Sequence, residues 1–524
     1  MSSVWELLYQ IQSPVWLSIT LILIVVAPIT HFIARRRRLN FPVVDFNRFK
    51  DDREAIITST LEHPNTPFIL PFPAPLVVLP ISTLEEVRNL PENQVSFIQE
   101  IKRMFSYKHT GIGITNPALN RTIKVDLTRH IAEALDAMQD EIRFSFDKQL
   151  GECNDWKKVN LYRTLTRVIA LLSGRVFVGL PTSRDEEWLD ATILYSRDCE
   201  LARQAIEKLP VAIRGFGARF LPAIRRLKKN QRRGAEILQP ILDQCMATAN
   251  SEKTRQTGAE NCQGTFFTWF LKELGNPTTV NTEDMYKYQM ALAFAAIHTT
   301  SGTSFQAILD LVARPQYIQP LRDEIDRIFQ EDGHDQDEDG FPKLKKSSMP
   351  KLKKLDSFLK ESQRLSPLGL LNLLRITTAP LTLSTGHTLP TGTRIAFPVY
   401  PVHMSTATPT YDPALNPSST LPPDEFDGFR FEQLRTVSGQ ENKHQFVTTS
   451  PDSLNFGHGI HACPGRFFAS NEIKVVLIEL LRSWEFRMVG DVEGKGGERP
   501  VDIVSHMSVI PDVGVEIEVR RRKA

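Results

Sequence analysis

Cysteine is scarce in this chain, and no two cysteines stand close enough to form a C-x-x-C pair. The five of them, in 524 residues, are odd in number and far apart. That spacing argues against a disulfide framework and against a zinc site, and it fits a reducing compartment. The net charge is only +2, so the composition gives no reason to expect a nucleic-acid partner. The sequence has neither an internal repeat nor a G-x-G-x-x-G fingerprint, so it gives no sign of a solenoid or of a dinucleotide site of its own.

The chain is otherwise of ordinary globular composition, with 41% hydrophobic and 24% charged residues. Helical patterns dominate residues 122–313, and the longest helix is expected over residues 284–311. Prolines alternate with apolar residues over 64–80 and again after Arg375, which indicates short strands and turns. The predicted fold is therefore mainly α with small β-sheets, in a single large domain over residues 39–524.

The N-terminus carries a separate signal. Residues 16–33 are almost wholly apolar, a length of about 18 residues that just suffices to cross a bilayer. Four arginines follow at 35–38, which places the rest of the chain in the cytosol by the positive-inside rule. We expect residues 1–38 to form an uncleaved membrane anchor. A cleaved signal peptide, which would carry its positive charge before the apolar run, and a helix buried in the core are the alternatives.

The most informative stretch is F-G-H-G-I-H-A-C-P-G-R at residues 456–466, where Cys463 stands in a glycine-studded turn. Apolar residues at helical spacing follow directly, so Cys463 should lie just before a helix N-terminus, where the dipole favours a thiolate. Gly459 and Gly465 allow a tight turn or the close approach of a flat partner. Such a thiolate suits an axial ligand of haem iron, although a lone cysteine can also be a simple core residue.

Phe456, Gly459, Cys463 and Gly465 match the pattern F-x-x-G-x-x-x-C-x-G, and on this match the chain resembles the cytochrome P450 family. The resemblance implies the P450 fold and a haem b cofactor whose iron is ligated by Cys463. His461 stands where most members carry arginine and some fungal members carry histidine.

The resemblance also implies contacts to the haem propionates. Arg375 matches a strand position that often carries a propionate-binding arginine or histidine, and His461 could serve the same purpose. The family's W-x-x-x-R motif is not found. Arg121, Lys124 and Arg129 lie in about the right region, but no tryptophan precedes them.

Glu361 and Arg364 are three residues apart and therefore share one helical face. Alone, such a pair could equally lie on a solvated surface. In the resembled family this pair is buried and is joined by an arginine from a later segment. Residues 426–431 resemble that segment, so Arg430 is the expected third member, with the structural task of holding the loop that presents Cys463.

The segment A-A-I-H-T-T at residues 295–300 could be a mere polar turn of an amphipathic helix. In the resembled family it belongs to the long helix that crosses the oxygen-binding face of the haem. Thr299 matches the threonine that supports bound dioxygen and relays protons, and Thr300 completes the motif. Ala296 replaces the usual glycine and His298 the usual acid, and a histidine can still pass protons near neutral pH.

The resemblance thus implies a membrane-anchored haem-thiolate monooxygenase of the endoplasmic reticulum, supplied with electrons by an NADPH–cytochrome P450 reductase. A haem-thiolate isomerase or dehydratase and a non-catalytic haem sensor are the rival functions; relatives of the first kind often lose the threonine found at position 299. A lysine-rich stretch at 343–354 is either a solvated loop or a positive patch for an acidic redox partner.

The substrate implied is lipophilic, with pocket walls at residues 97–115, 294–299 and 368–371. Tyr107, Lys108 and His109 could add a polar anchor, or simply be exposed loop residues. The motif variants resemble fungal secondary-metabolism members, including ent-kaurene-oxidase-like and indole-diterpene oxidases, which favours a terpenoid or meroterpenoid.

Overall fold

The computed structural model describes residues 39–114, 116–210, 213–250, 265–274, 282–337, 340–406, 411–412 and 421–523. Within these ranges no helix combines the length and the apolar character needed to cross a membrane. The segment 1–38, predicted to be the membrane anchor, lies outside the described residues, so that expectation stays a prediction.

Helices make up most of the described chain, as the sequence predicted. The long ones are α8 (Ile131–Leu150), α9 (Leu161–Phe177), α10 (Glu186–Glu207), α12 (Pro222–Asn250), α14 (Thr282–Ala313), α15 (Ile318–Asp332), α16 (Lys353–Leu365) and α19 (Arg466–Ser483). Shorter ones include α2 (Asp52–Glu62), α4 (Phe97–Met104), α5 (Tyr107–Thr110), α6 (Pro117–Arg121), α7 (Leu127–Arg129), α11 (Arg214–Gly217), α13 (Phe266–Leu274), α17 (Tyr400–His403) and α18 (Arg430–Leu434).

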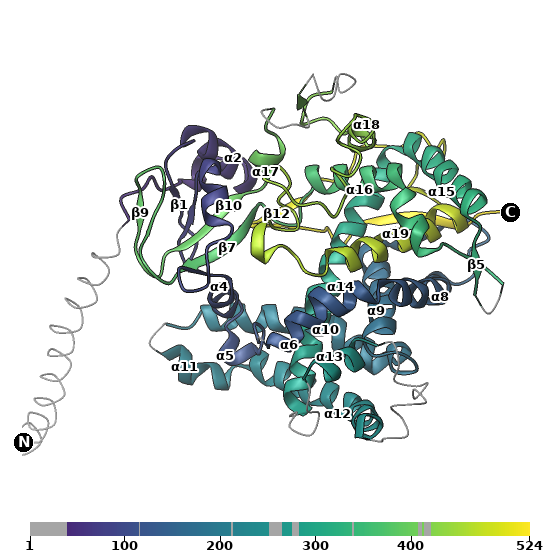
Figure 1. Ribbon diagram of the computed structural model, residues 1–524, viewed down its shortest axis with the longest axis horizontal. Coiled ribbons are helices and arrows are strands. Elements are labelled where there is room, and N and C mark those ends of the chain that lie inside the picture. The colour runs from purple at the N-terminus through teal and green to yellow at the C-terminus, as the bar shows by residue number, and fades with distance from the viewer. Residues whose placement is uncertain are drawn as a thin grey trace, which may run out of the picture.

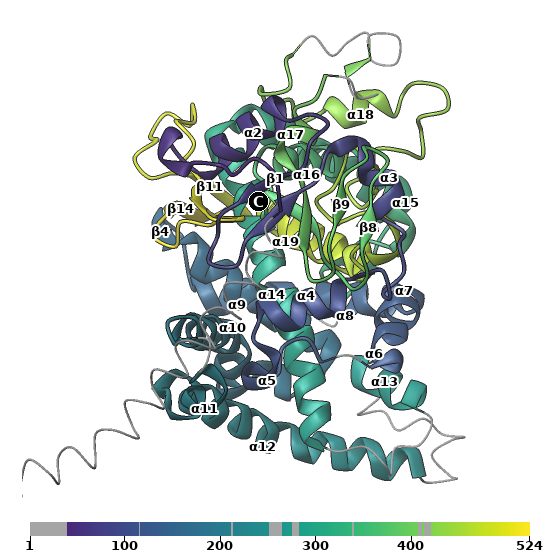
Figure 2. The same ribbon diagram turned by 90° about the vertical axis from the view of Figure 1, so that its left-hand side faces the viewer.

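Helix α14 is the axis of the molecule. It runs through the middle, with α12 toward one end and α16 and α18 toward the other (Figure 1, Figure 2). It packs against α9, α10, α12, α16 and α19. The sequence predicted this helix over residues 284–311, and the structure extends it only by two residues at each end. A helix surrounded on several sides must be apolar around much of its circumference, which α14 is.

The largest sheet has five strands in the order β1-β2-β10-β7-β3. These are β1 (Phe68–Leu70), β2 (Leu76–Val78), β3 (Val95–Ser96), β7 (Leu371–Thr377) and β10 (Arg394–Pro398). Every residue of β10 is buried, because the strand lies inside the sheet and is covered on both faces. β10 pairs antiparallel with β7, and the register shifts between Ile395 and Phe397.

The remaining sheets are small. A three-stranded sheet is formed by β11 (Trp484–Met488), β14 (Glu516–Arg521) and β4 (Lys157–Asn160). Three further sheets have two strands each: β12 (Ile503–Ser505) with β13 (Ser508–Ile510), β5 (Asp335–Gln336) with β6 (Pro342–Lys343), and β8 (Leu381–Thr382) with β9 (Thr388–Leu389). One large apolar cluster fills the helical part, and two smaller clusters lie at the five-stranded sheet. The segment 454–465 joins the two parts, since Leu454 packs in a cluster of the sheet and Phe456 packs against the helical core.

Candidate active site

The loop that carries Cys463 is closed by its own backbone. The Cys463 N–H donates to the Phe456 carbonyl at 2.7 Å, and the Ala462 N–H donates to the Gly459 carbonyl at 3.0 Å. Gly459 has a φ of +82°, and a Cβ there would stand 2.6 Å from the Arg88 carbonyl oxygen, so only glycine fits. Helix α19 begins at Arg466, which places Cys463 directly before a helix N-terminus, as the sequence indicated.

The Cys463 thiol does not ionise easily in the protein alone. Burial raises the pKa of this thiol, while the backbone N–H groups of Gly465 and Arg466 and the charge of Arg466 act in the opposite direction. The helix N-terminus thus favours the thiolate, as the sequence indicated, but the cost of desolvating the anion is larger. A metal cation bound at sulfur would reverse this balance, since a coordinating thiol is deprotonated outright.

Two residues of α14 carry accessible surface although the helix runs through the middle of the molecule. Ala295 and Thr299, one turn apart, are exposed, whereas Ile297 and Thr300 between and beside them are buried. The Thr299 hydroxyl donates to the Ala295 carbonyl at 2.6 Å. This face of α14, with Ala295 and Thr299, is therefore accessible in the middle of the helix.

His298 points to another side of the helix. Its Nε2 lies 3.1 Å from the Ile193 carbonyl of α10, and its Nδ1 lies 3.1 Å from the Tyr162 hydroxyl of α9. The carbonyl can only accept, so Nε2 carries the proton and Nδ1 accepts from Tyr162. Burial lowers the pKa of His298. Both ring nitrogens are thus engaged, and the structure does not bring His298 to the face of Thr299.

The three predicted pocket walls meet at α14. Phe105 packs edge-to-face on Phe294 with ring centroids 5.1 Å apart, which joins the 97–115 segment to the helix. A Cβ at Gly302 would stand 2.9 Å from Leu368, so the 368–371 segment lies directly against the helix one turn beyond Thr299. His109 instead lies among Lys108, Lys228 and Arg219, whose charges add to burial in lowering its pKa.

Glu361, Arg364 and Arg430 form one buried cluster. Arg364 grips Glu361 through two hydrogen bonds of 2.8 Å, from Nε to Oε2 and from Nη2 to Oε1. Arg430 Nε lies 3.2 Å from Glu361 Oε1, and both side chains are fully buried. Arg364 also donates to the Pro423 carbonyl at 2.5 Å. The three side chains therefore form a buried, hydrogen-bonded cluster that connects α16 to the segment before α18.

The comparison with known proteins agrees with this geometry. The family model described as Cytochrome P450 matches residues 116–506. The chain belongs to the cytochrome P450 family. Cytochrome P450 monooxygenase ascG of Acremonium egyptiacum is 47% identical, over 93% of this chain and 92% of its own length.

More distant relatives carry the same designation. Cytochrome P450 monooxygenase BOA4 of Botryotinia fuckeliana is 38% identical, over 93% of this chain and 92% of its own length. Cytochrome P450 monooxygenase ataF of Aspergillus terreus is 34% identical, over 91% of each chain. The resemblance seen in the sequence is confirmed, and this P450 is an oxidoreductase of the monooxygenase kind.

Positive groups gather at one side of the cysteine loop of this P450. The Arg375 guanidinium is buried on β7, donates to the Leu374 carbonyl at 2.8 Å and lies 5.0 Å from the centroid of the Phe97 ring. Burial lowers the pKa of Arg375 to about 10, with Glu92 opposing. Among the residues that the structure describes, no carboxylate forms an ion pair with it. A buried guanidinium of this kind is suited to an anionic group from outside the chain.

His461 lies beside the same phenylalanine, with ring centroids 5.4 Å apart. Its Nε2 is 3.2 Å from Glu92 Oε1 yet makes no hydrogen bond of acceptable geometry. Burial and the charge of Arg375 lower the pKa of His461, and Lys124 acts in the same direction. Of the three basic residues left open by the sequence, Arg121 pairs with Glu273 and Arg129 with Asp126, while Lys124 acts on His461 from a π-helical turn, Thr122–Asp126.

A haem fits these residues. Its iron needs a soft axial donor, which the sulfur of Cys463 provides. Its propionates need cations and hydrogen-bond donors, and Arg375 and Lys124 provide the first while the His461 imidazole can provide the second. A Cβ at Gly465 would meet no other atom within 4 Å, so the backbone after Cys463 is open to a flat group. Donor chemistry and backbone shape therefore agree with the family's cofactor.

Sequence reasoning missed a buried acid, Glu472 of α19. Its Oε1 accepts from the Ser173 hydroxyl of α9 at 2.6 Å, and no hydrogen bond of acceptable geometry reaches Oε2. Burial raises the pKa of Glu472 to about 8, although Ser173 and the Thr300 hydroxyl of α14 oppose this. Thr300 thus faces α19, away from the accessible side of α14. The signal that could have found Glu472 is an acid on the helix after Cys463 whose neighbours one helical turn away on either side are apolar, namely Phe468, Ala469, Val475 and Val476.

The Glu472→Gln variant is expected to remove a loss of stability that wild type shows as the pH rises from about 5 to 8. The folded pKa of about 8 exceeds the ordinary 4.5, so the folded protein keeps a proton that the unfolded chain releases. The contribution of Glu472 to the free energy of unfolding is therefore fully present below pH 4.5. It is lost as the pH rises toward 8, by roughly 3–5 kcal/mol in total. Glutamine does not titrate, so thermal unfolding at pH 5 and pH 8 should differ less for this variant. The exposed Glu498→Gln substitution is the control, and parallel pH profiles for wild type and Glu472→Gln would contradict the assignment.

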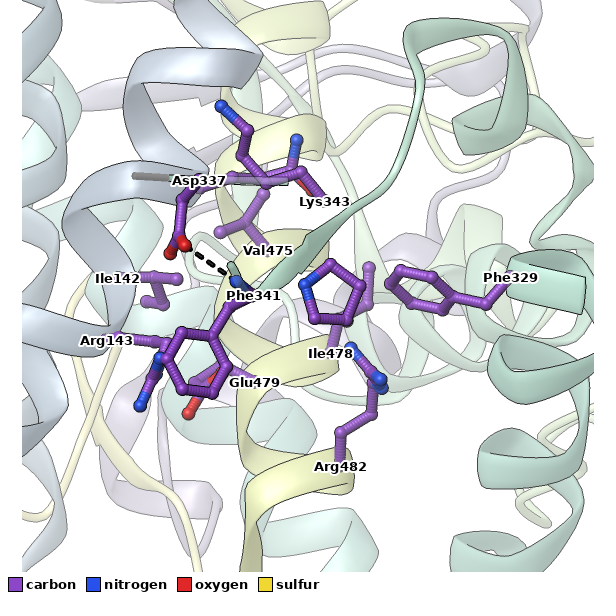
Figure 3. Close-up of a pocket in the computed structure, with 12 residues that line it drawn as sticks. Ile142, Arg143, Phe329, Asp337, Phe341, Lys343, Val475, Ile478, Glu479 and Arg482 are labelled. Atoms are coloured by element: carbon purple, nitrogen blue, oxygen red, sulfur yellow. Dashed lines mark hydrogen bonds between the residues drawn. The ribbon is translucent and has the colours of Figure 1, made fainter. Parts of the chain in front are cut away.

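The pocket in Figure 3 lies apart from these residues. It is a small pocket lined by side chains of α8, α15 and α19 and by Asp337, Phe341, Pro342 and Lys343. The guanidinium carbon of Arg143 lies 3.0 Å from the centroid of the Phe341 ring there. Lys343, on its rim, pairs with Asp136 at 2.5 Å and with Asp140 at 3.0 Å. Lys351 pairs with Asp332 at 2.5 Å. Part of the lysine-rich stretch is thus neutralised within the protein, which weakens the case for it as a partner patch.

Proposed function

We propose that this P450 holds haem b through Cys463 and hydroxylates a lipophilic natural-product intermediate of the terpenoid or meroterpenoid kind. When bound, a thiolate-ligated haem supplies cleavage of dioxygen and transfer of one oxygen atom to a carbon centre. The observation that carries the proposal is a cysteine loop before a helix, closed by its own backbone, in a fold whose central helix shows an accessible threonine. Electrons would come from an NADPH–cytochrome P450 reductase.

The side chains around this centre have separate tasks in the proposal. Cys463 binds the iron, and the N–H groups of Gly465 and Arg466 stabilise the charge on its sulfur. Arg375 and His461 hold the propionates, together with Lys124. Phe456 and Gly459 shape the turn, and the Glu361 cluster keeps it in place.

The substrate is proposed to lie against the accessible face of α14. Phe105 packs on Phe294 before Thr299, Leu368 lies against Gly302 after it, and all three of these side chains are apolar. A water-poor, apolar wall binds a lipophilic molecule and leaves few polar groups to orient it. The names of the relatives do not specify a substrate, so the terpenoid class rests on the motif variants at residues 295–300 and 456–466. Biosynthesis of a fungal secondary metabolite is the setting that these variants favour.

Turnover with labelled dioxygen tests this function. The full-length protein, its reductase and NADPH would be incubated with candidate terpenoids under ¹⁸O₂. Incorporation of one labelled oxygen atom, dependent on NADPH, is the expected result. Conversion of a substrate without NADPH and without label would instead identify a haem-thiolate isomerase or dehydratase.

The Thr299→Ala variant is expected to uncouple electron use from product formation. Removing the hydroxyl takes away the proton-carrying group that stands one turn from Ala295 on the accessible face of α14. Product formed per NADPH should fall by roughly tenfold or more, with peroxide released in its place. Ser301→Ala is the matched control, because the Ser301 hydroxyl makes the same kind of bond, to Ile297 at 2.6 Å, on the buried face. Unchanged coupling in Thr299→Ala would move the proton route elsewhere.

The chain is further proposed to consist of an anchor, residues 1–38, and a haem domain, residues 39–524, facing the cytosol from the endoplasmic reticulum membrane. Deletion of residues 1–38 should release the protein from the membrane fraction while the haem spectrum is retained. Centrifugation of cell lysates, with absorption spectra of both fractions, measures this. A truncated chain that still pellets with membranes would show a second point of attachment.

A further inference from the structure

The segment just before the cysteine loop is held from three elements. Asn372 of β7 donates from Nδ2 to the Leu454 carbonyl at 2.7 Å and to the Asn455 carbonyl at 3.3 Å. His403 of α17 accepts the Leu454 N–H at Nε2, at 3.3 Å. The Asn455 side chain in turn donates to the Gln363 carbonyl of α16 at 3.0 Å. Two consecutive residues are therefore fixed by four hydrogen bonds that involve side chains.

His403 connects this segment to the buried ion cluster. Its Nδ1 lies 3.2 Å from the Arg364 carbonyl, so Nδ1 carries the proton and Nε2 is free to accept. Arg364 returns a bond from Nη1 to the His403 carbonyl at 3.3 Å. The ring is buried, and burial lowers its pKa to about 3, which keeps it neutral. A protonated ring could not accept the Leu454 N–H, so the neutral form is the one this connection requires.

Asn372 is positioned by an unusual backbone. Its Oδ1 accepts the N–H of Leu373 at 2.7 Å, and Leu373 has a φ of +52°, a left-handed conformation that leucine seldom adopts. The conformation falls at the irregular stretch of the β7–β10 ladder. Arg375 follows two residues later on the same strand, so β7 brings the asparagine amide and a buried guanidinium to the same loop.

The hydrogen bonds continue from this segment to the cysteine. The Leu454 carbonyl, which Asn372 holds, also accepts the Gly457 N–H at 2.8 Å. Phe456, which lies between Leu454 and the turn, accepts the Cys463 N–H at 2.7 Å. A displacement of Leu454 would therefore pass through two backbone bonds to the residue that bears the sulfur.

We propose that His403 and Asn372 are positioning residues that transmit the rigidity of the Glu361–Arg364 pair to the Cys463 loop and fix the direction of its sulfur. The inference rests on the proposed role of Cys463 as iron ligand. If these hydrogen bonds only held the fold together, their loss would lower the stability of the protein and nothing else. If they position the loop, their loss also weakens the bond between the Cys463 sulfur and the iron.

Four full-length variants test this, with haem bound: Asn372→Ala, Asn372→Asp, His403→Ala and His403→Gln. The readouts are the share of the reduced carbon monoxide complex that shows the thiolate-type Soret band, the haem content and the thermal unfolding temperature. The alanine variants should lose at least half of the thiolate-type share. Asn372→Asp keeps the acceptor for Leu373 but loses the donor, so it should resemble the alanine variant. His403→Gln retains both a donor and an acceptor, so it should recover part of the share.

Gln139→Ala is the matched control. The Gln139 amide also makes two backbone hydrogen bonds, both to Leu344 at 2.8 and 3.0 Å, far from the cysteine loop. It should lower the unfolding temperature and leave the thiolate-type share unchanged. If the variants at Asn372 and His403 lower the unfolding temperature as Gln139→Ala does but keep the wild-type share of the thiolate-type band, the inference is overturned. If alanine variants fail to fold, Asn372→Asp and His403→Gln decide by the same share. Absence of a thiolate-type band from the wild type would instead refute the proposed function.

Discussion

Replacement of Cys463 by alanine should abolish the thiolate-type Soret band of the reduced carbon monoxide complex and all NADPH-dependent turnover. Alanine has no donor atom, and among the described residues no other cysteine lies in the loop before α19. Haem that is still retained through Arg375, His461 and Lys124 would show a spectrum of another type. The band is measured in parallel with haem content and thermal unfolding, which separate loss of the ligand from loss of the fold.

Cys199→Ala is the matched control for that prediction. Cys199 is a buried free cysteine on α10, and burial raises the pKa of its thiol to about 12. It should therefore remain a thiol, and its removal should leave the spectrum unchanged. Survival of the thiolate-type band in Cys463→Ala would show that another residue ligates the iron.

Glu361→Ala should destabilise the protein strongly. It leaves Arg364 and Arg430 buried, close together and without the carboxylate that both contact. It also removes the acceptor of the Asp427 N–H, at 2.9 Å. Breaking such a cluster from one side costs roughly 3–5 kcal/mol of unfolding free energy. Thermal unfolding of the holoprotein measures this, and most of the variant is expected in the haem-free or insoluble fraction.

Glu331→Ala provides the comparison for the buried cluster. Glu331 pairs with Arg327 at 2.9 Å, with both side chains about half exposed, so its removal should cost less than about 1 kcal/mol. Equal losses in the two variants would mean that the cluster contributes no more than a surface ion pair, and the structural role assigned to Glu361 would then be abandoned.

Local motifs explain why the central features could be predicted from the sequence. A cysteine in a glycine-bearing turn before a helical pattern specifies its own geometry within about ten residues, and the structure forms that turn from backbone bonds inside it. The same holds for the pairing of Glu361 with Arg364, which helical spacing alone brings to one face. Arg430 needed the family resemblance, because 66 residues separate it from Arg364 and no periodicity relates them.

Features that depend on neighbouring elements could not be predicted in this way. Periodicity shows that His298 and Thr299 point in different directions, but not that α9 and α10 supply partners to both nitrogens of His298. The effect of the helix terminus on the Cys463 thiol could be predicted because a helix terminus can be seen in a sequence, whereas the burial that raises the pKa of this thiol could not. Glu472, His403 and Asn372 were missed for the same reason, since each acts through partners distant in sequence.

The proposed site draws its residues from two parts of the molecule. The helical core contributes α14 with Thr299 and α19 behind Cys463, and the sheet contributes β7 with Asn372 and Arg375. The cysteine loop lies where the two parts meet, and the Glu361 cluster and His403 connect it to α16. The residues to which we assign the chemistry of this P450 are consequently held by contacts from elements far apart in the chain.

X-ray absorption at the iron edge of the purified full-length protein tests the central claim most directly. The account predicts one sulfur atom in the first coordination shell of the iron, present in the wild type and absent from Cys463→Ala. A shell made only of nitrogen and oxygen in a folded, haem-loaded wild type would contradict the assignment of Cys463, and with it the proposed haem-thiolate chemistry.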